Sequence, residues 1–271
     1  MNTYQRITDD KKVLTSSNPA DVWADWKGEK ETWLFLAPHD DDIILGAGLT
    51  FLAALTDGIN VHAAITTNGE SGYCRKEHRT KIAKVRQREA TASFKAMGLS
   101  KDHLHFLNFH DAGVDHCTGH FLTRKKSATS IEGATGLQNS YTWLLREVRP
   151  TRIFLPSITD IHPDHRTVHN EMVISVFHAS GAIWPELGKP LEDFPILYEY
   201  ATYNDFITPP NMRTTVPEEL LEKKLAGIAA YKSQEQIGAL IDIQRKAGCK
   251  EFVREIQFNL MTPGKYNYLF D

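Results

Sequence analysis

The sequence alternates short apolar runs with segments of helical periodicity, and this alternation constrains the fold more than any other feature. Apolar runs predict strands at residues 32–37, 60–66, 104–107, 152–155 and 197–203. Helical spacing predicts helices at residues 43–55, 80–97, 141–148, 166–178 and 217–231. This order predicts an α/β fold, a Rossmann-like three-layer sandwich whose mostly parallel sheet carries helices on both faces.

The length of 271 residues suits one large domain better than two. We expect a polar N-terminal extension over residues 1–30, anchored by Trp23 and Trp26, and a single α/β domain over residues 31–271. Hydrophobic residues make up 41% of the chain, enough to bury a core without a structural metal. A bound metal would therefore serve chemistry.

The charge pattern and the apolar stretches exclude several classes of partner. A formal net charge of −3 gives no reason to expect nucleic acid as a partner. The longest charge-free apolar stretch near the start, residues 43–56, is too short to span a bilayer. The N-terminal residues lack the apolar core of a secretory signal, and the three cysteines form no CxxC pair. We expect a cytoplasmic protein with no membrane segment, whose oligomeric state is open.

Polar clusters follow two of the predicted strands. His39-Asp40-Asp41-Asp42 comes directly after the first strand, and a second cluster, residues 157–165, follows the fourth. Ligands of parallel sheets bind at the carboxyl ends of the strands, where these clusters would meet. Either cluster alone would fit an ordinary capped helix start, but two together favour a metal site. A catalytic zinc takes three His or carboxylate ligands, and His39, Asp42 and His165 form such a set.

These clusters resemble the signatures of the PIG-L/LmbE-like N-deacetylases, Ala-His-Pro-Asp-Asp-Glu and His-Pro-Asp-His. The second signature stands intact at residues 162–165, and the first keeps its His-x-Asp-Asp spacing. The resemblance implies a hydrolase that removes an N-acetyl group from an amino sugar or a GlcNAc-containing glycoside. It also implies that His39, Asp42 and His165 bind Zn²⁺, although Fe²⁺ would suit the same ligands.

The same resemblance assigns roles around the metal. Asp41, a carboxylate that does not bind the ion, would be the general base for the attacking water, as its position also suggests. His162 would polarise the amide oxygen or protonate the departing amine. Asp164 would orient a neighbouring histidine.

Three weaker matches imply contacts with the sugar. Arg86 lies in an Arg-x-x-Glu helix, Asp111 precedes an Ala-Gly pair, and Glu70 lies in a Gly-Glu loop. Each also fits a plainer interpretation, a solvated helix charge for Arg86 and turn or segment caps for the two acids. Two departures from the signature, Asp40 for proline and Ile43 for glutamate, keep a non-catalytic sugar-binding protein open as an alternative.

Two further alternatives fit less well. His165 and His169 have the i, i+4 spacing of a zincin, but Arg166 stands where such a protease has its glutamate. A different metal-dependent amidohydrolase is also an alternative, in which another set of residues would bind the metal. A Rossmann nucleotide enzyme would need a glycine-rich loop after the first strand, where aspartates would instead repel a pyrophosphate. We expect residues 112–138 to form a long loop that helps select the substrate.

Overall fold

The computed structural model describes residues 1–270, so Asp271, the last residue of the expected domain, lies outside the described residues. The strands are β1 (Thr3–Ile7), β2 (Val13–Ser16), β3 (Thr32–Ala37), β4 (Asn60–Thr67), β5 (Leu104–Phe109), β6 (Phe121–Leu122), β7 (Ala134–Thr135), β8 (Arg152–Pro156), β9 (Ile196–Tyr200), β10 (Met212–Thr215) and β11 (Lys250–Ile256). The α-helices are α1 (Asp42–Gly46), α2 (Gly48–Thr56), α3 (Ile82–Met97), α4 (Leu137–Val148), α5 (Pro163–Ser180), α6 (Glu218–Ile228) and α7 (Ile237–Ala247).

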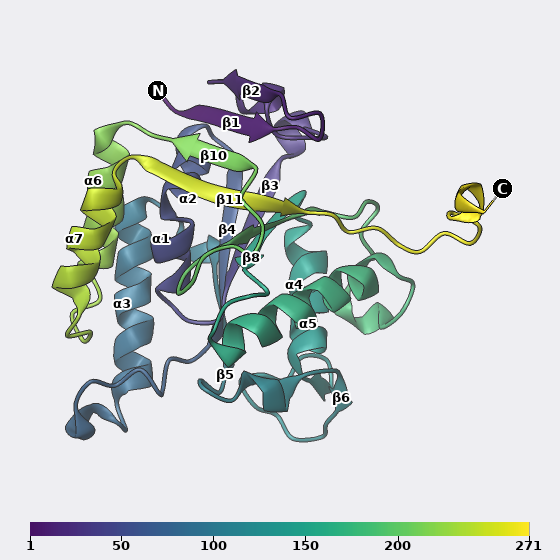
Figure 1. The fold of residues 1–271 in the computed structure, drawn as a ribbon. Helices are drawn as coiled ribbons and strands as arrows, with labels where there is room; N and C mark the ends of the chain where they lie inside the picture. The colour runs from purple at the N-terminus through teal and green to yellow at the C-terminus, as the bar shows by residue number, and fades with distance from the viewer. Residues whose placement is uncertain (271) are drawn as a thin grey trace.

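A large central sheet has the strand order β2-β1-β10-β11-β9-β8-β3-β4-β5. The pairs from β9 to β5 are parallel, whereas those from β2 to β9 are antiparallel (Figure 1). The prediction of a mostly parallel sheet was therefore wrong, and the sheet is mixed. The additional strands are antiparallel to their neighbours, and antiparallel pairing does not require a crossover helix between the two strands.

Helices cover both faces of the sheet, which gives the expected layered architecture (Figure 1). Along β3, Trp33 and Phe35 pack into one buried cluster while Leu34 and Leu36 pack into the other. The first cluster includes residues of α1, α2, α3 and α6, and the second includes residues of α4 and α5. A strand buried on both faces explains the continuous apolar run of residues 32–37.

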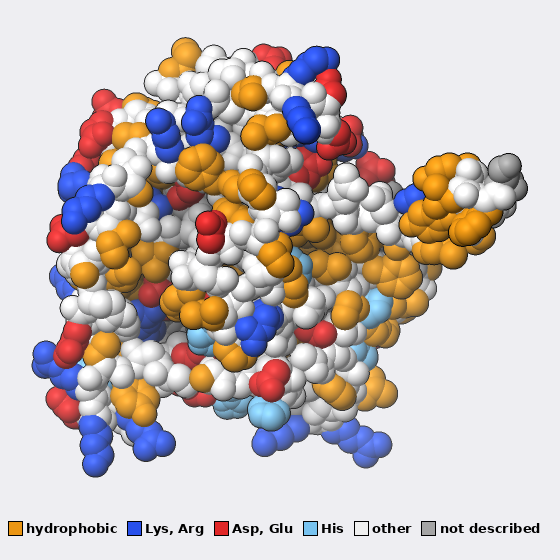
Figure 2. Space-filling view, viewed as in Figure 1, with side chains coloured by type: hydrophobic (Ala, Val, Ile, Leu, Met, Phe, Trp, Pro, Cys, Tyr) orange, Lys and Arg blue, Asp and Glu red, His pale blue; other side chains and the backbone are white. Residues whose placement is uncertain are grey.

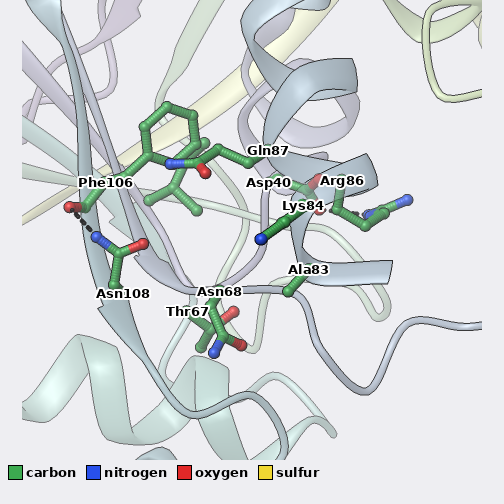
Figure 3. A pocket seen from close by; sticks show the side chains of 10 residues that line it. Asp40, Thr67, Asn68, Ala83, Lys84, Arg86, Gln87, Phe106 and Asn108 are labelled. Carbon is green, nitrogen blue, oxygen red and sulfur yellow. Dashed lines mark hydrogen bonds and ion pairs between the residues drawn. The ribbon is translucent and has the colours of Figure 1, made fainter. Parts of the chain in front are cut away.

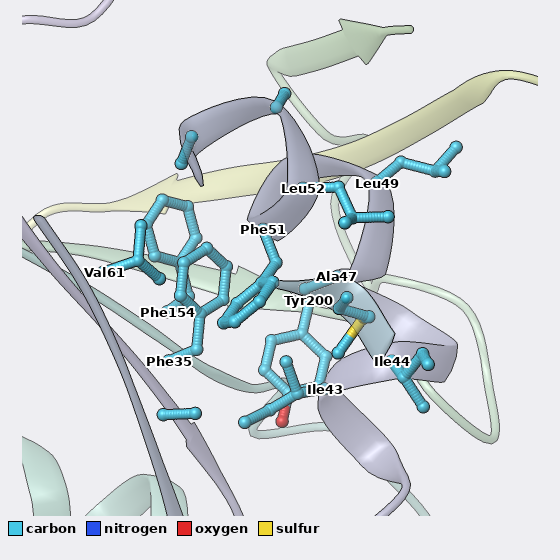
Figure 4. Close-up of a cluster of buried hydrophobic side chains, with 14 of the residues drawn as sticks. Phe35, Ile43, Ile44, Ala47, Leu49, Phe51, Leu52, Val61, Phe154 and Tyr200 are labelled. Atoms are coloured by element: carbon cyan, nitrogen blue, oxygen red, sulfur yellow. The ribbon is translucent and has the colours of Figure 1, made fainter. Parts of the chain in front are cut away.

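The first core cluster also accounts for Ile43. Its side chain is fully buried beside Phe35, Phe51 and Tyr200 (Figure 4). Close packing continues at Gly46, where an added Cβ would lie 2.6 Å from the Tyr200 ring and 2.7 Å from the carbonyl oxygen of Ala201. The helix after the first polar cluster is thus held firmly against the end of β9.

The first 30 residues contribute structure that periodicity did not indicate. They form β1 and β2, and β1 pairs with β10. Trp23 is 2% exposed and packs edge-on against Tyr4 and Tyr198. The predicted loop at 112–138 holds the short strands β6 and β7 and a 3₁₀ turn at Val114–Cys117.

Beyond β11 the chain leaves the body of the domain as an extended segment (Figure 1). Figure 2 shows hydrophobic side chains gathered on its projecting end. The exposed large side chains there are Leu260, Met261, Tyr266, Tyr268, Leu269 and Phe270.

Candidate metal centre and catalytic cleft

The two polar clusters meet at the carboxyl edge of the parallel strands. β3 has β4 on one side and β8 on the other, so the strand order reverses between β3 and β8. Loops after the strands that flank such a switch point form the ligand crevice of open α/β sheets. Residues 38–42 follow β3 and residues 157–165 follow β8, which places both clusters in that crevice.

Three donor atoms form a tight triangle in the crevice. His39 Nδ1 lies 3.2 Å from Asp42 Oδ2, which lies 3.2 Å from His165 Nε2. The two imidazole nitrogens are 3.3 Å apart. Ligands of a tetrahedral zinc, each about 2.0–2.1 Å from the ion, are about 3.3 Å from one another. The side chains expected to bind the metal are therefore spaced as such ligands are.

Carboxylates on the far side of both imidazole rings support this arrangement. His39 Nε2 lies 3.2 Å from Asp111 and 3.4 Å from Asp164. His165 Nδ1 lies 3.2 Å from Asp160 Oδ2. A carboxylate beside the second ring nitrogen favours the tautomer that leaves the first nitrogen free to bind metal.

Two further groups of potential donors share His39. One combines His39 with His162 and His165, and the other combines His39 with Asp111 and Asp164. We favour the triangle with Asp42 because Asp111 and Asp164 face the opposite ring nitrogen of His39. Asp42 Oδ2 also accepts a hydrogen bond from the backbone N–H of His39, at 2.8 Å, which fixes its orientation.

The carboxylates in and around the triangle favour a positive charge there. Burial opposes a charge on His39, but the carboxylates of Asp42, Asp111 and Asp164 outweigh burial and raise its pKa well above the usual value. Burial likewise opposes a charge on Asp42, while His165 and His39 hold its pKa far below the usual value. Closely spaced carboxylates stabilise positive charge, whether on a protonated imidazole or on a metal ion.

His162 is the N-cap residue of α5, and its ring lies next to that of His39 in the triangle. Its Nδ1 accepts a hydrogen bond from the backbone N–H of Asp164, at 3.2 Å, and Pro163 fills the first helical position. Burial and the nearby His39 lower the pKa of His162, which favours the neutral ring. With Nδ1 accepting, the proton of the neutral ring lies on Nε2, available for donation.

Asp164 links three parts of the crevice. It lies beside His39 and accepts hydrogen bonds from the backbone N–H groups of Ala112 (2.9 Å) and Val114 (3.4 Å). Burial opposes its charge, but the contact with His39 keeps the pKa of Asp164 below the usual value. The residue thereby ties the loop after β5 to α5.

The expected sugar contacts differ in where they lie. Asp111 lines the cleft, and its Oδ2 accepts a hydrogen bond from the Ser71 backbone at 3.0 Å. Glu70 does not line the cleft and is paired with the exposed His110 at 2.7 Å. Arg86 is 5% exposed and paired with Asp40 and Asp41.

Asp40 is the less expected partner in this ion pair. Its carboxylate contacts Arg86 (Figure 3). Burial raises the pKa of Asp40, although Arg86 opposes the rise and Asp41 adds to it. Neither Asp40 nor the buried Ile43 displaces a donor of the triangle.

Two residues of the site were not assigned roles from the sequence. Asp160 accepts the His162 backbone N–H at 2.9 Å and faces His165. Tyr203, expected at the end of a strand, lies in the loop after β9, where its ring centroid is 5.1 Å from that of His165. The position of Asp160 in the second cluster was a usable signal, whereas Tyr203 gave none.

The site opens into a cleft of about 310 Å³. Its wall combines the catalytic candidates with two glutamines from the far end of the chain. Lining residues are His39, Asp40, Asp41, Gly69, Ser71, Gly72, Arg86, Asp111, Ala112, His162, Tyr203, Gln234 and Gln236. Gln234 donates a hydrogen bond to the carbonyl oxygen of Gly72 at 2.8 Å, which joins the C-terminal region to the cleft.

His169 has a different role from that of a zincin ligand. Its Nδ1 lies 2.8 Å from the carbonyl oxygen of Pro156, to which it donates, and the residue is buried. The start of α1 carries the acidic Asp42 in place of a phosphate-binding glycine loop. These observations disfavour both the zincin and the nucleotide-binding alternatives.

Comparison with known proteins identifies the family of this chain. Residues 34–176, more than half of the chain, match the PIG-L family, described as GlcNAc-PI de-N-acetylase. The chain therefore belongs to the PIG-L family. No curated protein sequence gives a significant match.

Solved structures show how widely the fold is used. N,N'-diacetylchitobiose deacetylase from Pyrococcus horikoshii has 21% identity and a TM-score of 0.64, over 87% of this chain and 88% of that chain. A 4-carboxy-2-hydroxymuconate hydratase from Pseudomonas putida KT2440 has 17% identity and a TM-score of 0.60, over 86% and 98%. The zinc-inhibited form of a teicoplanin deacetylase has 14% identity and a TM-score of 0.55, over 84% and 100%. At such identities the likeness concerns the fold alone, and the reaction must be argued from the site.

None of the helices within residues 1–270 combines the length and the apolar character needed to cross a membrane.

Proposed function

We propose that this protein is a metal-dependent hydrolase that removes an N-acetyl or related acyl group from an amino sugar or a GlcNAc-containing glycoside. The donor triangle of His39, Asp42 and His165 carries the proposal, because it lies in an open cleft beside Asp41 and His162. Membership of the PIG-L family and the deacetylases among the structural neighbours support amide hydrolysis.

Zn²⁺ is the proposed metal, and Fe²⁺ would suit the same donors. When bound by the triangle, it would polarise the acyl oxygen and make water more acidic. The teicoplanin deacetylase solved in a zinc-inhibited form supports zinc binding in this fold. It also indicates that zinc can inhibit such an enzyme. Assays should therefore titrate the metal.

Asp41 is the proposed general base. Its side chain is 15% exposed, lines the cleft and lies one residue before the ligand Asp42. As water adds to the acyl carbon, Asp41 accepts its proton and then delivers a proton to the nitrogen as the C–N bond breaks. The products are a carboxylate, such as acetate, and an amino sugar.

His162 is proposed to stabilise the negative charge that develops on the acyl oxygen. Its neutral ring carries the proton on Nε2, so it can donate a hydrogen bond to that oxygen. Asp164 is proposed to orient His39, and Asp111 to contact a sugar hydroxyl while it also faces His39. Glu70 lies outside the cleft lining, so we propose that it contacts only a larger glycoside.

The direct test is amine release from N-acetylglucosamine, N,N'-diacetylchitobiose and simple GlcNAc glycosides by metal-loaded protein. We expect release that stops on chelation, returns with Zn²⁺ or Fe²⁺ and is lost in Asp41→Asn. A metal-loaded protein that binds these sugars but releases no amine would instead support the sugar-binding alternative.

A further inference from the structure

Arg86 lies on α3 and faces the loop after β3. Its side chain is already paired with acidic residues of that loop. Its Nη2 contacts the carboxylate of Asp40 and lies 3.1 Å from Asp41 Oδ2. The same nitrogen thus serves both carboxylates. Figure 3 shows the Asp40 and Arg86 side chains directed toward each other.

Packing fixes the guanidinium from other sides. Its central carbon lies 5.1 Å from the centre of the Tyr231 ring, within cation–π range. The Tyr231 hydroxyl donates a hydrogen bond to the Asp40 carbonyl oxygen. Gly69 packs on the Arg86 stem, since an added Cβ there would lie 3.2 Å from Arg86 Cβ. These contacts hold the guanidinium beside Asp40 and Asp41, while Arg86 Nε and Nη1 have no hydrogen-bond partner among the described residues.

The division of charge among the three residues suggests why Asp40 is present. A buried guanidinium needs an anionic partner, and Asp40 provides one whose side chain is only 5% exposed. Without Asp40, Asp41 would be the sole carboxylate facing Arg86, and the pair would draw together. With Asp40 in place, Asp41 only shares the guanidinium and keeps its place at the cleft.

We propose that Asp40 is a positioning residue that acts through Arg86 to hold the Asp41 carboxylate at the cleft. Arg86 then serves the base through Nη2, the nitrogen that faces both carboxylates. This inference rests on the proposed function, because it takes Asp41 as the general base.

The test compares steady-state kinetics of Asp40→Asn, Arg86→Gln and the double variant. We expect Asp40→Asn to lower kcat by about tenfold or more, because a displaced catalytic group can slow a reaction about a hundredfold. KM should stay within about twofold and bound metal should be unchanged. Arg86→Gln should also lower kcat, and the double variant should be no slower than the slower single variant, because Asp40 acts through Arg86.

Stability measurements separate positioning from simple structural support. Arg86→Gln leaves Asp40 buried without its cation and should lower Tm, and adding Asp40→Asn should restore Tm without restoring kcat. Glu251→Gln is the matched control, since it disturbs the buried pair with Lys224 (2.8 Å) away from the cleft. It should lower Tm while kcat stays within about twofold.

Three outcomes would overturn the inference. Asp40→Asn with wild-type kcat would show that Asp40 does not position the base. A rise in KM at unchanged kcat in Arg86→Gln would make Arg86 a substrate contact. A metal-loaded wild-type protein without amine release would remove the proposed function itself, a failure that is recognised before any variant is compared.

Discussion

His39 Nδ1 and His165 Nε2 lie 3.3 Å apart, although the two residues are 126 positions apart in the chain. Asp42 Oδ2 completes the triangle with both. We expect His165→Ala to lose bound metal and activity and to remain folded, while His169→Ala keeps the metal. Mass spectrometry measures the bound metal, and circular dichroism shows whether each variant is folded. Metal lost from His169→Ala but retained by His39→Ala would point to a different ligand set.

Replacement of Asp41, the proposed base, should separate catalysis from metal binding. Asp41→Asn keeps the size of the side chain but removes its ability to accept a proton at neutral pH. We expect kcat to fall by about 10²–10⁴-fold, the range for loss of a general base. Metal content should match that of the wild-type protein. Activity within about fivefold of wild type would assign proton transfer to another group.

A histidine cluster away from the cleft should make stability depend on pH. His62 stacks on His103 at 4.1 Å, and its Nδ1 lies 3.1 Å from His105 Nε2. Burial, then the charges of His103 and His105, lower the pKa of His62 to about 4. The unfolded chain, with a pKa near 6.5, binds the proton more readily, so stability is full above pH 6.5 and falls toward pH 4.

We expect this contribution to amount to about 1 kcal/mol, since the half-buried ring is partly screened by solvent. Urea unfolding at pH 7 and pH 5, with chelator present, measures it. His62→Gln should reduce the difference between the two pH values, although His105, whose pKa burial also lowers, still contributes. An unchanged difference in His62→Gln would place the titrating group elsewhere.

The buried ion pair at the opposite end of β3 should dominate local stability. Arg152 is fully buried and contacts Glu31 with two nitrogens, at 3.0 and 3.2 Å. Arg152→Met leaves Glu31 buried without a cation and should cost about 3–5 kcal/mol in the free energy of unfolding. Adding Glu31→Gln should recover much of the loss. Denaturant unfolding of both variants measures these changes. A loss below about 1 kcal/mol in the free energy of unfolding of Arg152→Met would show that solvent reaches the pair.

The parallel half of the sheet could be predicted because its central strands are buried on both faces. Residues 32–37 and 152–156 are buried throughout, so their sequences are nearly continuous apolar runs. The antiparallel half could not, because β11 alternates buried and more exposed residues over a charged sequence. Because many of its side chains are polar, β11 does not stand out in the sequence as a strand. Its partner β10 has only four residues.

The positions of the proposed metal ligands were predictable because each follows a strand in a recognisable cluster. The ion pair between Arg86 and Asp40 was not, because it depends on how α3 packs against the loop after β3. Tyr203 reaches the site only through the path of the loop after β9. Contacts between distant segments with no shared motif leave no pattern in the local sequence.

The proposed metal donors lie in the segments that follow β3 and β8, two strands that are neighbours in the sheet but distant along the chain. An ion bound there would act as a cross-link that closes a long stretch of polypeptide and binds only the native state. Folded protein would then gain stability with the logarithm of free metal concentration. The protein's resistance to unfolding, and so its lifetime, would follow the supply of metal around it.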